Sequence, residues 1–96
     1  MTPELFFASL TETRPPQGLT PALSALWWCA KGDWEAAHGL AQDDASRAGS
    51  WVHAHLHRVE GDLGNAAYWY ARAQRPVHRG ELDQERRDMV AALLGA

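Results

Sequence analysis

Cysteine, lysine and long apolar runs are all scarce in this sequence. Cys29 is the only cysteine, so no internal disulfide can form, and Lys31 is the only lysine. The nine basic residues are scattered and the net charge is -3, whereas affinity for nucleic acid or an anionic membrane normally needs clustered positive charge. No apolar run approaches the roughly 20 residues that span a bilayer. We therefore expect neither a nucleic-acid partner nor a membrane partner.

Sequence motifs of several enzyme classes are also missing. The chain has no Gly-x-Gly-x-x-Gly or phosphate-loop pattern, and no serine in a Gly-x-Ser-x-Gly turn. Residues 1–17 lack the basic start and apolar core of a signal peptide, which favours a cytoplasmic protein. The 96 residues suffice for one domain with a modest core, but not for a two-domain enzyme with an interdomain cleft.

Helix start and stop signals, by contrast, recur along the chain. Thr2 and Thr20 each precede a proline, which pairs a capping hydroxyl with proline at the first helical position. Aspartate follows glycine at 32–33 and at 61–62, where glycine suits the end of one helix and aspartate caps the next. These signals predict an all-α domain of five or six helices, the last of which covers an exposed apolar face. Four of the expected helices span about residues 3–13, 20–31, 49–60 and 81–94. Another follows the Asp33 cap and precedes the polar stretch that begins at Asp43, and one more follows the Asp62 cap and runs to about Gln74.

The two Gly-Asp pairs, which begin at Gly32 and Gly61, lie 29 residues apart and each mark a turn between helices. The helices around them therefore form an internal repeat. Each turn has the pattern Gly-Asp-x-x-x-Ala, and Tyr70 and Ala73 follow the second copy. The pattern resembles the turn and second helix of tetratricopeptide repeats. That resemblance implies two helical hairpins, in which the Gly-Asp pair turns the chain and the small alanine lets the helices approach closely. The single domain then consists of an N-terminal helix and proline-rich loop (1–19), two hairpins (20–44 and 45–76) and a capping helix (77–96).

A second resemblance rests on residues 53–62 and 65–70. The patterns are His-Ala-x-Leu-His-Arg-x-Glu-Gly-Asp and Asn-Ala-x-Tyr-Trp-Tyr. This signature is similar to that of short, uncharacterised bacterial proteins, and it implies no particular activity.

Residues 53–62 are also the part of the chain that most suggests chemistry, because three histidines stand at alternate positions. On a helix, residues four apart differ in direction by about 40°, whereas residues two apart differ by about 200°. His53 and His57 therefore share a face, with Glu60 close to it. His55 points away from that face.

Two interpretations of the shared face stay open. His53, His57 and Glu60 have the chemistry to bind one divalent metal ion, and with Tyr68 or Tyr70 they have the chemistry for acid-base catalysis. The alternative is a polar part of the core, in which both histidines form hydrogen bonds with Tyr68, Asn65 or the backbone.

The other face offers a candidate binding edge. In the tetratricopeptide register, Trp51, His55 and Arg58 lie on the groove side of their helix. An aromatic ring, an imidazole and a guanidinium together suit a carboxylate or a peptide terminus, and Trp69 is a further candidate contact. The alternative is that Arg58 pairs with Glu60, Asp62 or solvent while Trp51 packs on a neighbouring helix.

Other polar residues are expected to have structural roles. Cys29 lies mid-helix and is expected to be a buried, unreactive thiol. His38 falls on the inward face of its helix, where it needs a hydrogen bond across to a neighbouring helix. In the last helix, Glu85, Arg86 and Arg87 are placed for solvent, opposite the apolar face.

We therefore expect a non-enzymatic interaction module that binds a peptide or a small acidic ligand and uses no cofactor. The alternative is a small enzyme that depends on a divalent metal or on acid-base catalysis. The five tryptophans are many for this length, and adjacent aromatic residues on a helix cannot all face one core. A homodimer formed through such rings is compatible with either function.

Overall fold

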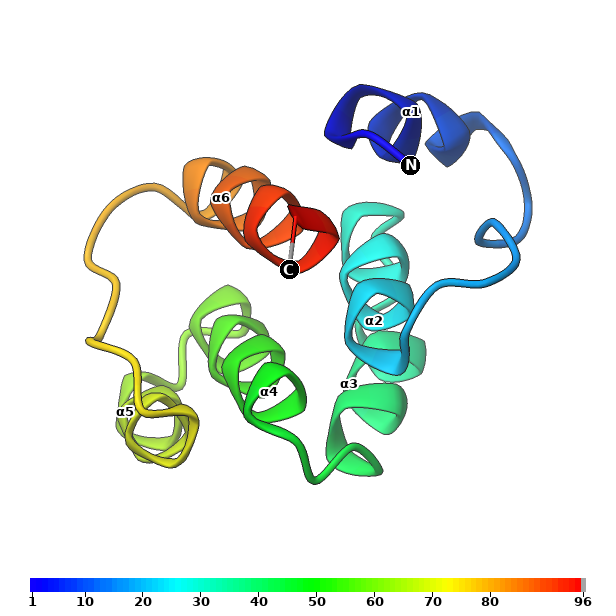
Figure 1. Cartoon of the computed structure of the whole chain (residues 1–96). Coiled ribbons are helices and arrows are strands. Elements are labelled where there is room, and N and C mark those ends of the chain that lie inside the picture. Colours follow the sequence, from blue (N-terminus) through cyan, green and yellow to red (C-terminus); the bar gives the residue numbers. More distant parts are fainter. Residues whose placement is uncertain (96) are drawn as a thin grey trace.

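The structure is a computed structural model that describes residues 1–95. Its described part contains six α-helices, one short 3₁₀ helix and no strand, which confirms the predicted all-α class (Figure 1). The elements are α1 (Pro3–Ala8), η1 (Ser9–Thr11), α2 (Pro21–Ala30), α3 (Trp34–Gln42), α4 (Arg47–Val59), α5 (Leu63–Ala73) and α6 (Leu82–Gly95). No helix in this range is both long and apolar enough to cross a membrane.

Most helix starts follow the capping signals in the sequence. The hydroxyl groups of Thr2 and Thr20 accept hydrogen bonds from backbone amides in the first turns of α1 and α2. The start of α4 differs from the prediction by two residues, because the Ser46 side chain caps the helix by accepting a hydrogen bond from the Gly49 amide. The first helix is also shorter than expected: α-helix ends at Ala8 and only the 3₁₀ turn continues to Thr11.

The turn at residue 32 and the turn at residue 61 have the same geometry, as their repeated sequence predicts. Gly32 and Gly61 have φ values of +89° and +86°, in the left-handed region that glycine adopts without strain. The carboxylates of Asp33 and Asp62 then cap α3 and α5. Helices α2 and α3 form one hairpin and α4 and α5 form another, as their extensive mutual contacts indicate (Figure 1).

Helix α4 lies at the centre of the structure. It contacts α5 within its own hairpin, α3 and α2 from the other hairpin, and α6. Helix α6 also contacts α2 and α1 (Figure 1). Its Met89 and Val90 are fully buried in the main core with Phe6 and Trp27. The last helix therefore covers apolar surface as predicted. Because several helices surround α4, polar side chains on more than one of its faces become buried.

Candidate functional site

All three histidines of α4 are buried, and they face two different environments. His53 and His57 stack on each other with ring centroids 4.8 Å apart, which confirms that residues four apart share a face. His55 lies on another side, where it meets α6. The exposed fractions are only 3% for His53, 0% for His55 and 5% for His57, so each imidazole needs partners within the protein.

The first environment contains a cluster of three imidazoles. His38, on α3, joins His53 and His57, and one nitrogen from each ring lies within 4.8 Å of the others. The shortest of these contacts joins Nε2 of His38 to Nε2 of His53 at 3.0 Å. Each nitrogen carries either a proton or a lone pair, so in a neutral pair one ring donates this hydrogen bond and the other accepts it.

Tryptophan rings hold two of these imidazoles in place. Trp34 stacks on His38 with centroids 4.6 Å apart, and Trp69 stacks on His53 with centroids 3.8 Å apart. The Trp34 indole N–H donates a 2.8 Å hydrogen bond to the Leu56 carbonyl, which ties α3 to α4. The imidazoles and the tryptophans that hold them therefore come from three helices, and these side chains restrict one another's rotamers.

Glu60 orients the third imidazole and is not itself the third member of the cluster. Nδ1 of His57 donates a 2.5 Å hydrogen bond to a carboxylate oxygen of Glu60. In a neutral ring this bond places the proton on Nδ1, which leaves the lone pair on Nε2. In place of the set of His53, His57 and Glu60 that the sequence suggested, the structure brings together His38, His53 and His57.

A second group that can hold a metal is formed by His57, Glu60 and Asp62. The Glu60 and Asp62 residues are exposed, and an oxygen of Asp62 caps α5 by accepting a hydrogen bond from the Asn65 amide. The imidazole cluster is better enclosed and more rigidly supported, so it is the candidate site.

Two of the imidazoles, those of His38 and His53, are held in the neutral form. Burial, helped by the neighbouring His38 and His57, lowers the pKa of His53 to about 4. Burial and His57 also lower the pKa of His38, against an opposing effect of Glu60. Nδ1 of His53 is buried and has no hydrogen-bond partner within the described part of the chain. Neutral imidazoles at neutral pH are able to act as metal ligands without first losing a proton.

The cluster opens into a pocket of about 490 Å³ between α3, α4 and α5. Tyr68 and Asn65 line this pocket but do not form the predicted hydrogen bonds with His53 or His57, whose partners are His38 and Glu60. Tyr68 is instead 54% exposed, and its hydroxyl accepts a hydrogen bond from Arg72. The full lining consists of Trp34, His38, Gln42, His53, His57, Asn65, Tyr68 and Trp69.

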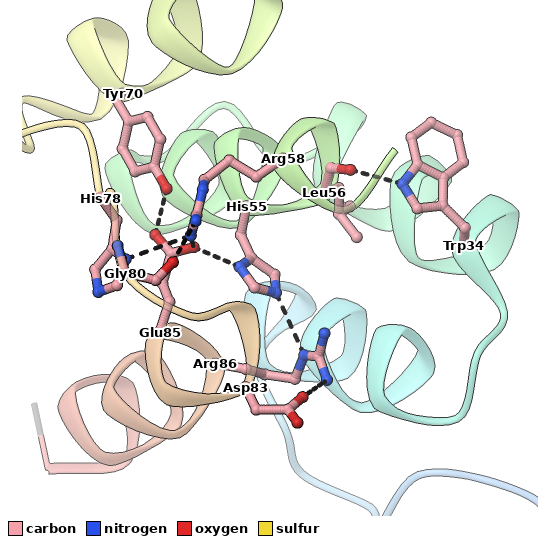
Figure 2. A network of polar contacts seen from close by, with 10 residues as sticks. All are labelled: Trp34, His55, Leu56, Arg58, Tyr70, His78, Gly80, Asp83, Glu85 and Arg86. Carbon is pink, nitrogen blue, oxygen red and sulfur yellow. Dashed lines mark hydrogen bonds and ion pairs between the residues drawn. The ribbon is translucent and has the colours of Figure 1, made fainter. Parts of the chain in front are cut away.

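The second environment, around His55, is a closed network centred on Glu85 (Figure 2). His55 Nδ1 and Arg58 each contact the same Glu85 oxygen at 2.7 Å, and the Tyr70 hydroxyl donates to the other oxygen. Glu85 is only 1% exposed. The prediction that Glu85 faces solvent is therefore wrong, because its position on α6 places it against α4 and α5, where three donors surround the carboxylate.

The protonation states of this network are also fixed. His55 Nδ1 donates to Glu85 while its Nε2 accepts a 3.3 Å hydrogen bond from Arg86, which defines the neutral tautomer. Burial lowers the pKa of His55 in spite of Glu85. Burial alone raises the pKa of Glu85, but the hydrogen bonds from His55 and Tyr70, together with Arg58, lower it to about 2. A buried carboxylate thus carries its charge beside a guanidinium.

This network changes the environment of the predicted binding edge. Helix α6 covers His55 and Arg58, and Arg58 also donates to the Gly80 carbonyl and contacts His78 (Figure 2). His78, which the sequence places in a loop before the last helix, is therefore partly buried. The alternative pairing of Arg58 with Glu60, Asp62 or solvent is replaced by its pairing with Glu85.

The other two predicted binding residues, Trp51 and Trp69, pack against the same small core cluster but have different further contacts. The Arg75 guanidinium lies 3.9 Å from the ring centroid of Trp51, which is partly buried against the core. Trp69 belongs to the imidazole pocket instead. Cys29 is buried as expected, and burial raises the pKa of its thiol in spite of Arg86. The ligand-binding role of Trp51, His55, Arg58 and Trp69 stays a prediction.

His38 is the member of the cluster that the sequence alone did not assign. Its position four residues after Trp34 and its inward-facing register were visible, and these suggested a hydrogen bond to a neighbouring helix. That bond exists, with His53 as the partner. Nothing in the local pattern, however, indicated that the partner would be another histidine.

Comparison with protein-family models, with curated proteins and with solved structures finds no match for this chain.

Proposed function

We propose that this domain binds one divalent transition-metal ion, such as Zn²⁺, through His38, His53 and His57. The observation that carries the proposal is the convergence of three imidazole nitrogens, from two helices, at the base of an open pocket. Imidazole is a common ligand for zinc and for several related ions, and three histidines form a known zinc-binding set.

The distances in the cluster support this proposal. Two nitrogen ligands of a tetrahedral zinc ion are separated by roughly 3.3 Å, because each Zn–N bond is about 2.0–2.1 Å long. Nε2 of His38 and Nε2 of His53 are 3.0 Å apart, so a small opening of this contact accommodates an ion. The third nitrogen already lies within 4.8 Å of both.

The surroundings of His57 support it as well. Metal-binding histidines usually donate their second ring N–H to a carboxylate, which orients the ring and raises its basicity. The 2.5 Å contact from His57 to Glu60 has this form. The lowered pKa values of His38 and His53 favour the neutral state that coordination requires.

The test is a zinc titration of protein that carries no histidine tag and has been treated with a chelator. We expect one equivalent per chain by calorimetry and elemental analysis. His38→Gln and His53→Gln each remove one ligand and should weaken binding at least about 100-fold, since even outer partners of a ligand contribute about 10- to 100-fold. His78→Gln, which removes an imidazole outside the cluster, should leave the affinity unchanged.

Circular dichroism establishes that each variant is folded. The half-buried His38 is the safer position for this comparison than the buried His53. Absence of stoichiometric binding in the native protein, or equal affinity in folded His38→Gln, rules the proposal out.

A second candidate function is the binding of a peptide or small acidic ligand without a metal, which the sequence favoured. Its support is the aromatic wall of the same pocket, where Trp69 is half-buried, Tyr68 is exposed and Arg72 lies 5.2 Å from the Trp69 ring centroid. Ligand binding that persists in the presence of chelator and in His38→Gln, but is lost in Tyr68→Ala, would favour this function over metal binding.

A further inference from the structure

We infer that the metal ion proposed at His38, His53 and His57 keeps an open coordination position that takes a small carboxylate ligand. The inference rests on the proposed metal binding and adds the class of molecule that the site recognises. It follows from three features of the pocket: the number of protein ligands, the charge of its lining and its size.

The first feature is the number of ligands. Within residues 1–95, the group around His53 contains three histidines and no fourth histidine, cysteine or acidic residue. Glu60, the nearby carboxylate, is engaged with Nδ1 of His57, on the opposite edge of that ring from Nε2. Zinc sites with three protein ligands keep a fourth position for water or for an external ligand, whereas structural sites use four protein ligands.

The second feature is charge. The residues that line the pocket include no aspartate, glutamate, lysine or arginine. Neutral imidazoles do not compensate the two positive charges of a bound ion, and Glu60 supplies only one negative charge behind His57. The occupied pocket therefore carries net positive charge, which favours an anion at the open position.

The third feature is the size and chemistry of the walls. A volume of about 490 Å³ exceeds the space that a single water needs and falls within the range of small-molecule pockets. Gln42 and Asn65 contribute carboxamides to the lining, and Trp34 and Trp69 contribute indole rings. A carboxylate bound to the metal by one oxygen has a second oxygen that can accept a hydrogen bond from an amide, while its organic part lies against the rings.

The test uses protein loaded with Co²⁺, whose visible absorption reports the number and type of its ligands. Benzoate, acetate, inorganic phosphate and the neutral isostere benzamide are titrated into the loaded protein. We expect saturable spectral changes with both carboxylates, at lower concentration for benzoate because its ring can pack on the indoles. Benzamide should leave the spectrum unchanged, and phosphate should saturate only at higher concentration than acetate.

Two variants test the role of the amides. Gln42→Ala and Asn65→Ala alter exposed side chains that lie outside the imidazole cluster, so folding and Co²⁺ affinity should be retained. Each should weaken benzoate binding by about two- to tenfold, the range expected for one hydrogen bond. Gln84→Ala, an exposed amide on α6, is the matched control and should have no effect.

The outcomes separate the two proposals. Failure of Co²⁺ to bind overturns both the metal site and this inference. A bound Co²⁺ whose spectrum does not respond to carboxylates overturns the inference alone and leaves the metal site standing. Phosphate binding as tight as acetate binding overturns the carboxylate assignment, because the site would then select only for negative charge.

Discussion

The two histidine environments of α4 differ in how completely their polar groups are satisfied. Around Glu85, one carboxylate receives hydrogen bonds from His55, Arg58 and Tyr70, and a positive charge lies beside the negative one. Around His53, three imidazoles meet in a pocket whose lining has no charged side chain, and Nδ1 of His53 has no hydrogen-bond partner among residues 1–95. The first environment is complete without a ligand, whereas the second gains from one.

This difference is the reason to assign a structural role to His55 and to propose metal binding for the cluster around His53. A buried ion pair whose hydrogen bonds are all made fixes the arrangement of the helices that supply it, here α4, α5 and α6. The imidazole cluster lies beside an open pocket, and imidazole nitrogens can present lone pairs to an ion. On α4, the side that carries His55 therefore joins helices, and the side that carries His53 and His57 faces the pocket.

The largest effect on stability should follow from Glu85→Gln. The substitution keeps the side-chain shape but leaves the Arg58 guanidinium, which is only 11% exposed, without its negative partner. Breaking a buried pair on one side typically costs about 3–5 kcal/mol. Urea unfolding should show a loss of this size, with metal binding retained wherever the variant is folded.

Asp88→Asn is the matched control, because it removes one carboxylate from an exposed position of the same helix. Its free energy of unfolding should stay close to that of the native protein. If Glu85→Gln and Asp88→Asn have equal stabilities, the Glu85 network is not what holds α6 in place.

The next effect is a loss of stability in acid. The pKa of Glu85 is about 2 in the folded state and 4.5 without its environment. Above pH 4.5 the Glu85 carboxylate is ionised in both the folded and the unfolded state, so its full stabilisation is present. As the pH falls from 4.5 toward 2, the unfolded chain binds the proton first, and the stabilisation is lost. Roughly 2–3 kcal/mol should disappear over this interval.

The measurement is the free energy of unfolding from pH 5 to pH 2 for the native protein and for Glu85→Gln. The groups that face Glu85 are His55, Arg58 and Tyr70, and Arg86 contacts it through His55. The difference in stability between the two proteins should shrink as the pH falls. A constant difference would mean that Glu85 ionisation contributes nothing.

The smallest effect on stability, but a clear one on binding, is expected for Glu60→Gln. Glu60 is 39% exposed and bonded to His57, so its loss should change the free energy of unfolding little. Zinc affinity should nevertheless fall about tenfold, because the substitution removes the charge that orients and polarises a metal ligand. Glu35→Gln, an exposed acid on α3, should change neither quantity.

Parallel titrations of the native protein and both variants measure this effect. If Glu60→Gln binds zinc as tightly as the native protein does, metal binding by the imidazole cluster does not depend on the Glu60 carboxylate. A large decrease in its free energy of unfolding would show instead that the Glu60 contact stabilises the fold, as the Glu85 network does.

Much of the fold could be predicted from the sequence, because its signals are local. Thr20, Asp33 and Asp62 cap helices through side chains three residues from the amides they bind. The division of α4 into a face with His53 and a face with His55 follows from helical periodicity alone. The start of α4 at Arg47 also depends on a local signal, since the Ser46 side chain caps the helix through the Gly49 amide three residues further on.

The partners of those faces could not be predicted in the same way. A helix with one apolar face would leave Glu85 in solvent, but α6 contacts α1, α2 and α4, and Glu85 lies between helices. His38 lies 15 residues from His53, and Glu85 lies 30 residues from His55. No spacing rule connects such pairs.

The sequence by itself determined the helices, the two glycine turns and the direction of each histidine on α4, since these depend on hydrogen bonds and steric contacts between residues close along the chain. Only the tertiary structure decided that His38 completes an open imidazole cluster and that Glu85 closes the network around His55. The physical reason is that burial and ligand geometry depend on which helices pack together, and that packing is set by the whole apolar core.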